Sequence, residues 1–200
     1  MIRPFEGEEM DRSDEALYES FIKQNDEGAI RLLFDKYREL LIYYINGILH
    51  NIDDSEEIMM DCFAVVIAQT TRFSARRGSS FKTWLYAIAT KRAYMFMRKN
   101  HVVENTDECE DIAADEFEIP EKILLKEEKH KGLYKAMNSL SADQRTVLYL
   151  KFFEDMSPEE ISRVMKKSVR QVYKLTDKGK SRLRELLERS GMEGIAQWDM

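Results

Sequence analysis

Three helix-start signals follow one another closely in the last third of the chain. Each is a capping box, in which an N-cap serine accepts a hydrogen bond from the backbone three residues on and a Glu or Gln there reaches back. Signals spaced so closely leave room only for compact helices joined by short turns. The boxes are Ser141–Gln144, Ser157–Glu160 and Ser168–Gln171, and Pro158 stands at the first helical position of the second.

The second and third boxes predict a helix-turn-helix. The helix that starts at Ser157 has about two turns before residues 166–168 form a tight connection. The helix that follows is longer and basic, since Arg163 to Arg189 contain ten Lys or Arg and three Asp or Glu. Two helices joined by such a turn, with Lys and Arg side chains on the second helix, are typical of DNA-binding proteins.

The outward side of that basic helix carries groups that can recognise base edges. Its inward stripe is apolar and consists of Val172, Leu175, Gly179, Leu183 and Leu186. Arg, Lys and Gln at the N-terminal end of the helix then point away from the core, where they can donate to guanine or pair with adenine. We expect bases to be contacted by Arg170, Gln171 and Lys174, and phosphates by Lys166, Lys167, Ser168, Lys178 and Arg182.

This local positive charge contrasts with a formal net charge of -6 for the whole chain. Residues 1 to 71 hold 16 acids and 6 bases, and residues 100 to 128 hold 11 and 2. By contrast, residues 72 to 99 hold no acid and 8 bases, and residues 129 to 200 hold 10 and 15. A polyanion can therefore bind at these two basic segments despite the net negative charge of the chain. Because of that net charge, we expect the free protein to bind duplex DNA weakly.

The N-terminal half predicts one compact helical domain. Apolar residues recur at helical spacing from Glu15 to about His50, and again in a final basic segment. Between these stretches, Asp54 as N-cap and Glu57 three residues on predict another capping box. We expect the domain to span residues 14–100.

Aromatic residues are interleaved with the Lys and Arg residues of positions 72–99. Rings beside cations suit single-stranded nucleic acid, whose bases stack on rings while its phosphates meet the cations. Packing competes with this role, because Trp84 and Tyr86 lie among predicted core residues, and for any one ring packing is favoured. The polar loop of residues 74–80 is the better candidate for base contacts. The predicted core residues are Phe81, Leu85, Ile88 and Ala89.

Residues 101–124 are strongly acidic and have no helical period, so they predict a linker, most simply a solvated one. A second domain, residues 125–190, contains the helix-turn-helix. We therefore expect an all-α fold of two small helical domains joined by an acidic linker. One domain suited to opened strands and one suited to duplex indicate a protein that acts in transcription initiation.

Several other classes of site are not indicated. Cys62 and Cys109 form no CxxC pair and lack a neighbouring His, so we expect free thiols and neither a metal nor a cofactor. No signal peptide or run of about 18 apolar residues stands in the sequence, which predicts a cytoplasmic protein without membrane insertion. No nucleophile or phosphate-loop motif occurs, and the histidines are scattered, so we expect no catalytic residues.

The order and spacing of these segments resemble the bacterial RNA polymerase sigma factors of the extracytoplasmic-function (ECF) type. "DSEEIMMDCF" is similar to a region 2 motif of that family, as is "FKTWLYAIATKRAYMFMRK". "LSADQRTVLYLKFFEDMSPEEISRVMKKSVRQVYKLTDKGKSRLRELL" resembles its region 4. The likeness covers about residues 25–99 and 129–188.

The resemblance implies that the chain is not an enzyme and gives core RNA polymerase its promoter specificity. Region 4 would bind the minus-35 element as duplex, and the acidic linker would run through the nucleic-acid channels of the polymerase. Region 2 would dock on the clamp helices of the largest subunit through Asp54, Glu56, Glu57, Asp61 and Phe63. The melted minus-10 element would be bound by Arg72, Ser74, Arg76, Arg77, Ser79, Ser80, Lys82, Trp84, Tyr86, Lys91 and Arg92.

The chain departs from the family pattern in ways that bear on DNA recognition and docking. In region 2, Met60, Lys91 and Met95 replace the usual Gln, Asn and Asp. In region 4, Ser141 replaces a Pro and Lys166 a Gly, and the lysine adds a possible phosphate contact. Such sigma factors are commonly held inactive by an anti-sigma factor, which we expect as a further partner.

Two other classes of protein fit part of this sequence. A stand-alone helix-turn-helix repressor would bind operator DNA tightly without polymerase, but it leaves the aromatic and basic segment unexplained. A helical interaction protein would explain the acidic segments, and it would show no salt-dependent affinity for nucleic acid.

Overall fold

The computed structural model describes residues 12–68, 73, 79–101 and 136–189. Helices make up all the regular secondary structure in these ranges, which confirms the predicted all-α class. None of them is long and apolar enough to cross a bilayer. The helices are α1 (Asp14–Gln24), α2 (Glu27–Leu49), α3 (Ile52–Ala68), α4 (Phe81–His101), α7 (Ala142–Phe152), α8 (Pro158–Met165) and α9 (Val169–Arg189).

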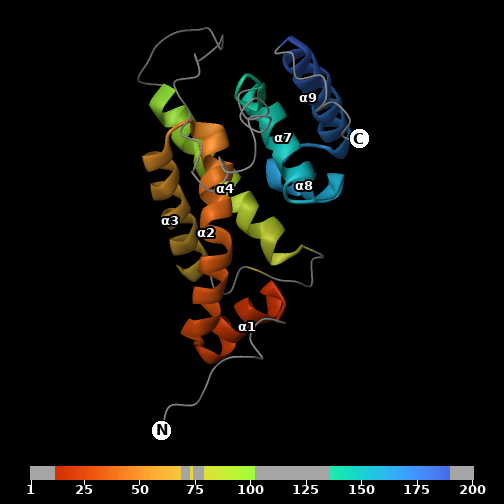
Figure 1. The fold of residues 1–200 in the computed structure, drawn as a ribbon. Coiled ribbons are helices and arrows are strands. Elements are labelled where there is room, and N and C mark those ends of the chain that lie inside the picture. The colour runs from red at the N-terminus through yellow and green to blue at the C-terminus, as the bar shows by residue number, and fades with distance from the viewer. Residues whose placement is uncertain (1–11, 69–72, 74–78, 102–135, 190–200) are drawn as a thin grey trace.

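Helices α1 to α4 form an N-terminal bundle, in which α2, α3 and α4 run side by side (Figure 1). The apolar period that continues from Glu15 to His50 is divided between two helices. Asn25 adopts a left-handed conformation with φ of 53° and ends α1. The carboxylate of Asp26 then accepts a hydrogen bond from Ala29 N at 3.1 Å and starts α2. This sharp turn folds α1 back onto α2.

The predicted N-cap at Asp54 is wrong. Helix α3 already begins at Ile52, and the side chain of Asn51 accepts from Asp54 N at 3.0 Å. Asparagine caps a helix as well as aspartate does. Because His50 ends α2 in a left-handed conformation, Asn51 reaches the capping position before Asp54 does. Asp54 therefore lies inside the first turn of α3.

Helices α7, α8 and α9 form a C-terminal unit, and all three capping boxes predicted for it are confirmed. Backbone N–H groups donate to the three serines at 3.3–3.4 Å, and the Gln or Glu of each box reaches back. The apolar stripe of α9 packs on α7, with Val172 and Gly179 buried. A Cβ on Gly179 would meet the side chain of Leu148 at 3.2 Å, so the glycine permits the close approach of these helices.

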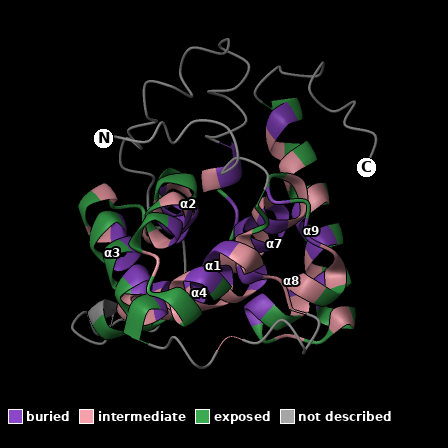
Figure 2. Cartoon of the chain, turned by 90° about the horizontal axis from the view of Figure 1, so that it is seen from below, coloured by how far each residue is buried: buried purple, intermediate pink, exposed green. Residues whose placement is uncertain are grey.

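The N-terminal bundle and the C-terminal unit pack directly against each other, which the sequence did not predict. Helix α8 lies on α4, and α7 lies on α2. Buried residues from both parts form one continuous apolar cluster, and exposed residues lie on the outer sides of helices such as α3 (Figure 2). His101, the first residue of the predicted linker, is the last residue of α4, and residues 102–124 lie outside the described residues.

Arg145 of α7 stands at one end of this contact and is only 7% exposed. Its guanidinium donates to the backbone oxygen of Gly47 near the end of α2 and contacts His50 Nε2. Other N–H groups of the same guanidinium donate at 2.7–2.9 Å to the backbone oxygens of Met137, Asn138 and Leu140. These bonds close the turn before α7. One side chain thus ties the start of the C-terminal unit to the N-terminal bundle.

We expect the chain to lose stability as pH falls from about 6.5 to about 4. Desolvation, together with the positive charge of Arg145, lowers the pKa of His50 from 6.5 to about 4. The unfolded chain therefore takes up this proton at a higher pH than the folded chain, so acid favours unfolding in that window. Solvent reaches part of the side chain, which reduces the expected loss to about 1 kcal/mol.

Denaturant midpoints at pH 7 and pH 4.5 measure this effect. His50→Asn is the matched variant, because asparagine tolerates the left-handed conformation at this position and does not titrate. A smaller pH dependence is expected in the variant. The same pH dependence in both proteins would contradict the assignment to His50.

Candidate nucleic-acid interface

The turn between α8 and α9 is closed by hydrogen bonds around one serine. Lys166 ends α8 with φ of 52°, and its N–H and that of Lys167 both donate to Ser162 O. Ser162 Oγ donates to Lys167 O at 2.6 Å. A lysine with this backbone costs about 1 kcal/mol relative to glycine, which explains the usual Gly of the family pattern at this position. The bonds set the direction in which α9 leaves the turn.

The three residues expected to recognise bases lie together at the exposed start of α9. Arg170, Gln171 and Lys174 are all exposed, as the inward apolar stripe predicted. Among the residues expected to contact phosphate, Lys166 and Ser168 are exposed as well. Lys167 is half-buried, and its ammonium pairs with Asp143 at 2.8 Å. The start of α9 thus presents a compact positive surface.

Gln171 also holds the start of its own helix. Its Oε1 accepts from Ser168 N at 2.8 Å and from Ser168 Oγ at 2.9 Å. An amide held in this way can still donate with its nitrogen, but it cannot swing freely to make two bonds to adenine. Gln171 therefore has a structural role that competes with base recognition.

Two substitutions separate these roles of Gln171. Gln171→Ala is expected to cost about 1 kcal/mol of unfolding free energy through loss of the cap. Gln171→Glu is expected to change it by less than about 0.5 kcal/mol, because glutamate closes the same box. If the residue also contacts DNA, the carboxylate variant still binds DNA more weakly, since it cannot donate and it repels phosphate. Denaturant unfolding and fluorescence anisotropy with promoter DNA measure the two effects, and wild-type DNA affinity in Gln171→Glu would assign the residue to the cap alone.

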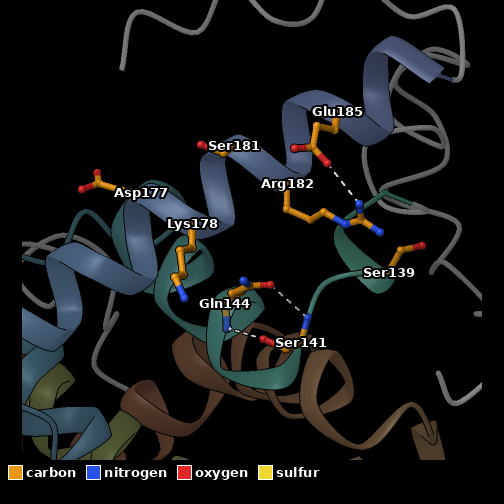
Figure 3. Close-up of a pocket in the computed structure, with 8 residues that line it drawn as sticks. All are labelled: Ser139, Ser141, Gln144, Asp177, Lys178, Ser181, Arg182 and Glu185. Atoms are coloured by element: carbon orange, nitrogen blue, oxygen red, sulfur yellow. Dashed lines mark hydrogen bonds and ion pairs between the residues drawn. The ribbon is translucent and has the colours of Figure 1, made fainter. Parts of the chain in front are cut away.

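Lys178 and Arg182 lie one and two turns further along α9, beside a polar groove of about 570 Å³ against the start of α7 (Figure 3). Arg182 pairs with Glu185 at 3.0 Å, and Ser141 and Gln144 close the groove from α7. The side chains of Lys178 and Arg182 are both exposed. Their place beyond the start of the helix fits contacts to backbone phosphate better than contacts to bases.

Part of the expected minus-10 surface is described, and its residues do not form one exposed patch. Lys91 is exposed, whereas Arg92 pairs with Asp61 of α3 at 2.5 Å. Lys82 donates to Glu154 O of the C-terminal unit at 2.5 Å. Ser79, Ser80, Trp84 and Tyr86 are also described, and Arg72, Ser74, Arg76 and Arg77 lie outside the described residues.

The rings of Trp84 and Tyr86 pack inside the N-terminal bundle. Trp84 lies 5.3 Å from Phe73 and 5.4 Å from Tyr18, between ring centroids. Tyr86 is fully buried against Tyr44 at 4.9 Å. In this arrangement the ring of Tyr86 cannot reach a base. The minus-10 assignment of both rings stays a prediction that would require the C-terminal unit or the aromatic cluster to move.

The expected docking surface lies on the outer side of α3. Glu56, Glu57 and Asp61 are exposed there, and Asp54 is half-buried. Phe63 is only 3% exposed and packs edge-on against Phe34, so in this arrangement its ring faces the core. Two exposed apolar residues of α3 were not among the expected docking residues: Met60, next to Asp61, at 55% exposure, and Ile67, further along the helix, at 48%. A helical wheel that first placed the core of α3 would have left both outside.

Two family comparisons match separate parts of the chain, in the order seen in the fold. Residues 33–102 match Sigma-70 region 2, and residues 130–183 match Sigma-70 region 4. Between them these matches cover well over half of the chain, including the outer side of α3, helix α4 and the helix-turn-helix.

Several curated proteins resemble most of the chain. The RNA polymerase sigma-H factor of Pseudomonas aeruginosa is 29% identical over 158 residues, which cover 72% of this chain and 78% of that protein. The ECF RNA polymerase sigma factor SigX of Bacillus subtilis is 24% identical over 168 residues, covering 81% and 85%. The ECF RNA polymerase sigma-E factor of Escherichia coli is 25% identical over 162 residues, covering 76% and 83%.

Solved structures share the fold. CnrH in complex with the cytosolic domain of CnrY matches with a TM-score of 0.63 and 16% identity, covering 89% of this chain and 99% of that chain. The sigma factor RpoE in complex with the anti-sigma factor NepR, from Bartonella quintana, matches with a TM-score of 0.60 and 21% identity, covering 79% and 96%. With both sigma-70 regions present in order and ECF factors among its relatives, the chain belongs to the RNA polymerase sigma factors of the ECF type.

Proposed function

We propose that this sigma factor binds core RNA polymerase and directs it to a set of promoters, whose minus-35 element it reads as duplex and whose minus-10 element it binds as a melted strand. The observation that carries the proposal is the exposed, basic start of α9 after a tight turn, in a chain that also contains sigma-70 region 2. The family consists of initiation factors and not of enzymes. Its site of action would be the cytoplasm, where the polymerase works.

For the minus-35 element, α9 would enter the major groove with its N-terminal turn. Arg170 and Lys174 are exposed one turn apart and can donate to the two acceptors of guanine. Lys166 and Ser168 stand on the preceding turn, where phosphate contacts would set the register, and Lys178 and Arg182 would follow the backbone. For the minus-10 element, Lys91 is exposed on α4, and of the described basic residues in the expected set it is the one without an ion pair to another described segment.

For the polymerase, the outer side of α3 would be the docking surface, with the clamp helices of the largest subunit as its partner. Glu56, Glu57 and Asp61 supply negative charge, which speeds association with a basic partner. Met60 beside these charges and Ile67 further along α3 supply apolar area, of the kind that interface centres bury. We add these two residues to the docking set, while Asp54 and Phe63 would contribute only from the margin or the core.

An anti-sigma factor is the further partner that we propose. Two structural relatives were solved as complexes, CnrH with the cytosolic domain of CnrY and RpoE with the anti-sigma factor NepR. A regulator of this chain would cover the docking surface on α3, the start of α9, or both.

Transcription in vitro tests the proposal. Purified core polymerase is incubated with fragmented DNA of the source organism, with and without the full chain, and the transcripts are sequenced. Discrete transcripts that require the chain are expected, and their start sites would reveal the promoter. No such transcripts, together with no binding to core polymerase, would contradict the proposal and favour a stand-alone DNA-binding protein.

A further inference from the structure

Helix α1 lies beside the start of α4 at one end of the N-terminal bundle (Figure 1). It precedes residues 33–102, which match Sigma-70 region 2, so the family match assigns it no role. Its first turn is fixed on α2, because the carboxylate of Asp14 accepts hydrogen bonds from the hydroxyl of Tyr37 at 2.5 Å and from Lys36 Nζ at 2.6 Å. Side chains of α1 therefore provide fixed points for the segments that pack on it.

Glu15 of α1 caps the start of α4. Its carboxylate accepts a hydrogen bond from Phe81 N at 2.8 Å, although the two residues are 66 positions apart. Ser80 Oγ accepts from Thr83 N at 3.1 Å, so the first turn of α4 has one acceptor of its own and one from α1. A negative group is also favourable beside the positive end of the helix dipole. Helix α1 thus fixes the position at which α4 begins.

Tyr18, further along α1, is the centre of an aromatic cluster and is only 1% exposed. Its ring centroid lies 5.1 Å from that of Phe81, 5.4 Å from that of Trp84 and 5.5 Å from that of Phe73. The hydroxyl of Tyr18 donates to Val66 O near the end of α3 at 3.1 Å. One side chain of α1 thus contacts the end of α3, a residue between α3 and α4, and the start of α4.

This arrangement holds residues that belong to the proposed minus-10 surface. Ser79 and Ser80 directly precede α4, and Trp84 lies in its first turn. A strand that is bound through several side chains requires all of them in place together, so its affinity falls with the fraction of molecules in that arrangement. Fixing the start of α4 before DNA arrives also reduces the ordering cost of binding.

We propose that Glu15 and Tyr18 are positioning residues for the melted minus-10 strand, which hold Phe73 and the start of α4 in the arrangement that binds it. This inference rests on the proposed function, because it requires the N-terminal bundle to bind such a strand. The charge of Glu15 agrees with an indirect role, since a carboxylate that faced the strand would repel its phosphates. Glu15 therefore favours strand binding through the position of α4 and not through contact with the strand.

Two variants and two controls test the proposal in the full chain. Glu15→Ala removes the cap from α4, whereas Glu15→Gln keeps an oxygen that can accept from Phe81 N. Tyr18→Phe keeps the ring in the cluster and removes the hydrogen bond to Val66 O. Glu19→Ala is the matched control, because Glu19 is an exposed acid on the same helix.

Three binding measurements separate the minus-10 strand from the other partners. The promoter is taken from the transcripts made with the wild-type chain, and each protein is bound to core polymerase. Fluorescence anisotropy with a forked promoter, single-stranded across the minus-10 element, gives the affinity for the strand. A duplex that ends before that element gives the affinity for the minus-35 element, and titration with labelled core polymerase gives the affinity for core.

The fluorescence of Trp84 reports on the aromatic cluster in the free chain. Trp198→Phe, introduced into every protein, leaves Trp84 as the only tryptophan. Quenching by acrylamide then measures how far solvent reaches the cluster. Denaturant unfolding of each protein verifies that it is folded under the conditions of the measurements.

Glu15→Ala is expected to bind the forked promoter about fivefold more weakly, the effect of losing one helix cap. Tyr18→Phe should bind it about threefold more weakly, because a single hydrogen bond is lost. In both variants acrylamide should quench Trp84 more strongly, while the affinities for core and for the minus-35 duplex should be those of the wild type. Glu15→Gln and Glu19→Ala should bind the forked promoter within about twofold of the wild type.

Wild-type affinity of Glu15→Ala for the forked promoter would overturn the proposal, and so would unchanged quenching of Trp84. An equal loss in Glu15→Gln would assign the effect to charge, and an equal loss of core affinity would assign it to general damage of the bundle, so either result also overturns the positioning role. All four results leave the proposed function intact, because the wild type still binds its promoter. Absence of chain-dependent transcripts and of core binding by the wild type would instead overturn the proposed function and this inference with it.

Discussion

Arg145→Leu is expected to lower the free energy of unfolding by about 3–5 kcal/mol, the cost of removing one member of a buried charged network. The guanidinium bonds the backbone oxygens of four residues, and leucine leaves these acceptors without a donor in a buried site. Burial lowers the pKa of Arg145 only to about 10, so the side chain is still charged at neutral pH. Denaturant unfolding measures the loss.

Arg184→Leu is the matched control, since Arg184 is exposed on α9 and its loss should change the unfolding free energy by less than about 0.5 kcal/mol. Arg145→Lys should lie between the two, because an ammonium retains the charge but cannot reach all four acceptors. A loss below about 1 kcal/mol in Arg145→Leu would show that water or a repacked turn replaces the guanidinium.

The double change Arg170→Ala with Lys174→Ala is expected to weaken binding to the minus-35 element by at least about a hundredfold. A good contact to a base edge contributes about 1–3 kcal/mol of discrimination, and both side chains are exposed at the start of α9. Neither takes part in the capping box, so the fold should be unaffected. Transcription from a promoter identified with the wild-type chain, and anisotropy with its duplex, measure the loss.

Lys178→Ala provides the comparison for a contact to phosphate. It should weaken binding to all sequences about equally and reduce the slope of log affinity against log salt by about 1. The double variant should instead lose discrimination between the promoter and a scrambled duplex. Equal losses on both duplexes in the double variant would reassign Arg170 and Lys174 to phosphate contacts.

Local patterns predicted the C-terminal unit well. Capping boxes at Ser141, Ser157 and Ser168 depend on residues three apart, so the sequence contains all their members. The apolar stripe of α9 likewise predicted which side faces α7, and hence which side carries Arg170 and Lys174. Helical periodicity is a property of one segment and needs no knowledge of its neighbours.

Predictions that depended on competition between groups were less successful. Asn51 caps α3 in place of Asp54, because His50 ends the preceding helix in a left-handed conformation. Sequence patterns do not reveal that conformation. Met60 and Ile67 were not assigned to the docking surface because α3 is rich in apolar residues, and its exposed side becomes clear only once its core residues are identified. Residues 74–78 of the loop before α4 and residues 102–124 of the linker lie outside the described residues, so those predictions stay untested.

The sequence by itself determined the helix starts of the C-terminal unit and the exposed basic start of α9, because each depends on residues close together in the chain. The order of its motifs indicated the family. Only the tertiary structure decided that region 4 rests on α4 and α2, where Lys82 meets Glu154 and Arg145 meets Gly47. Those partners are 72 and 98 positions apart, and no local period relates them. These residues pair because the apolar surfaces of the N-terminal bundle and the C-terminal unit pack against each other and bury both. That packing depends on the whole chain.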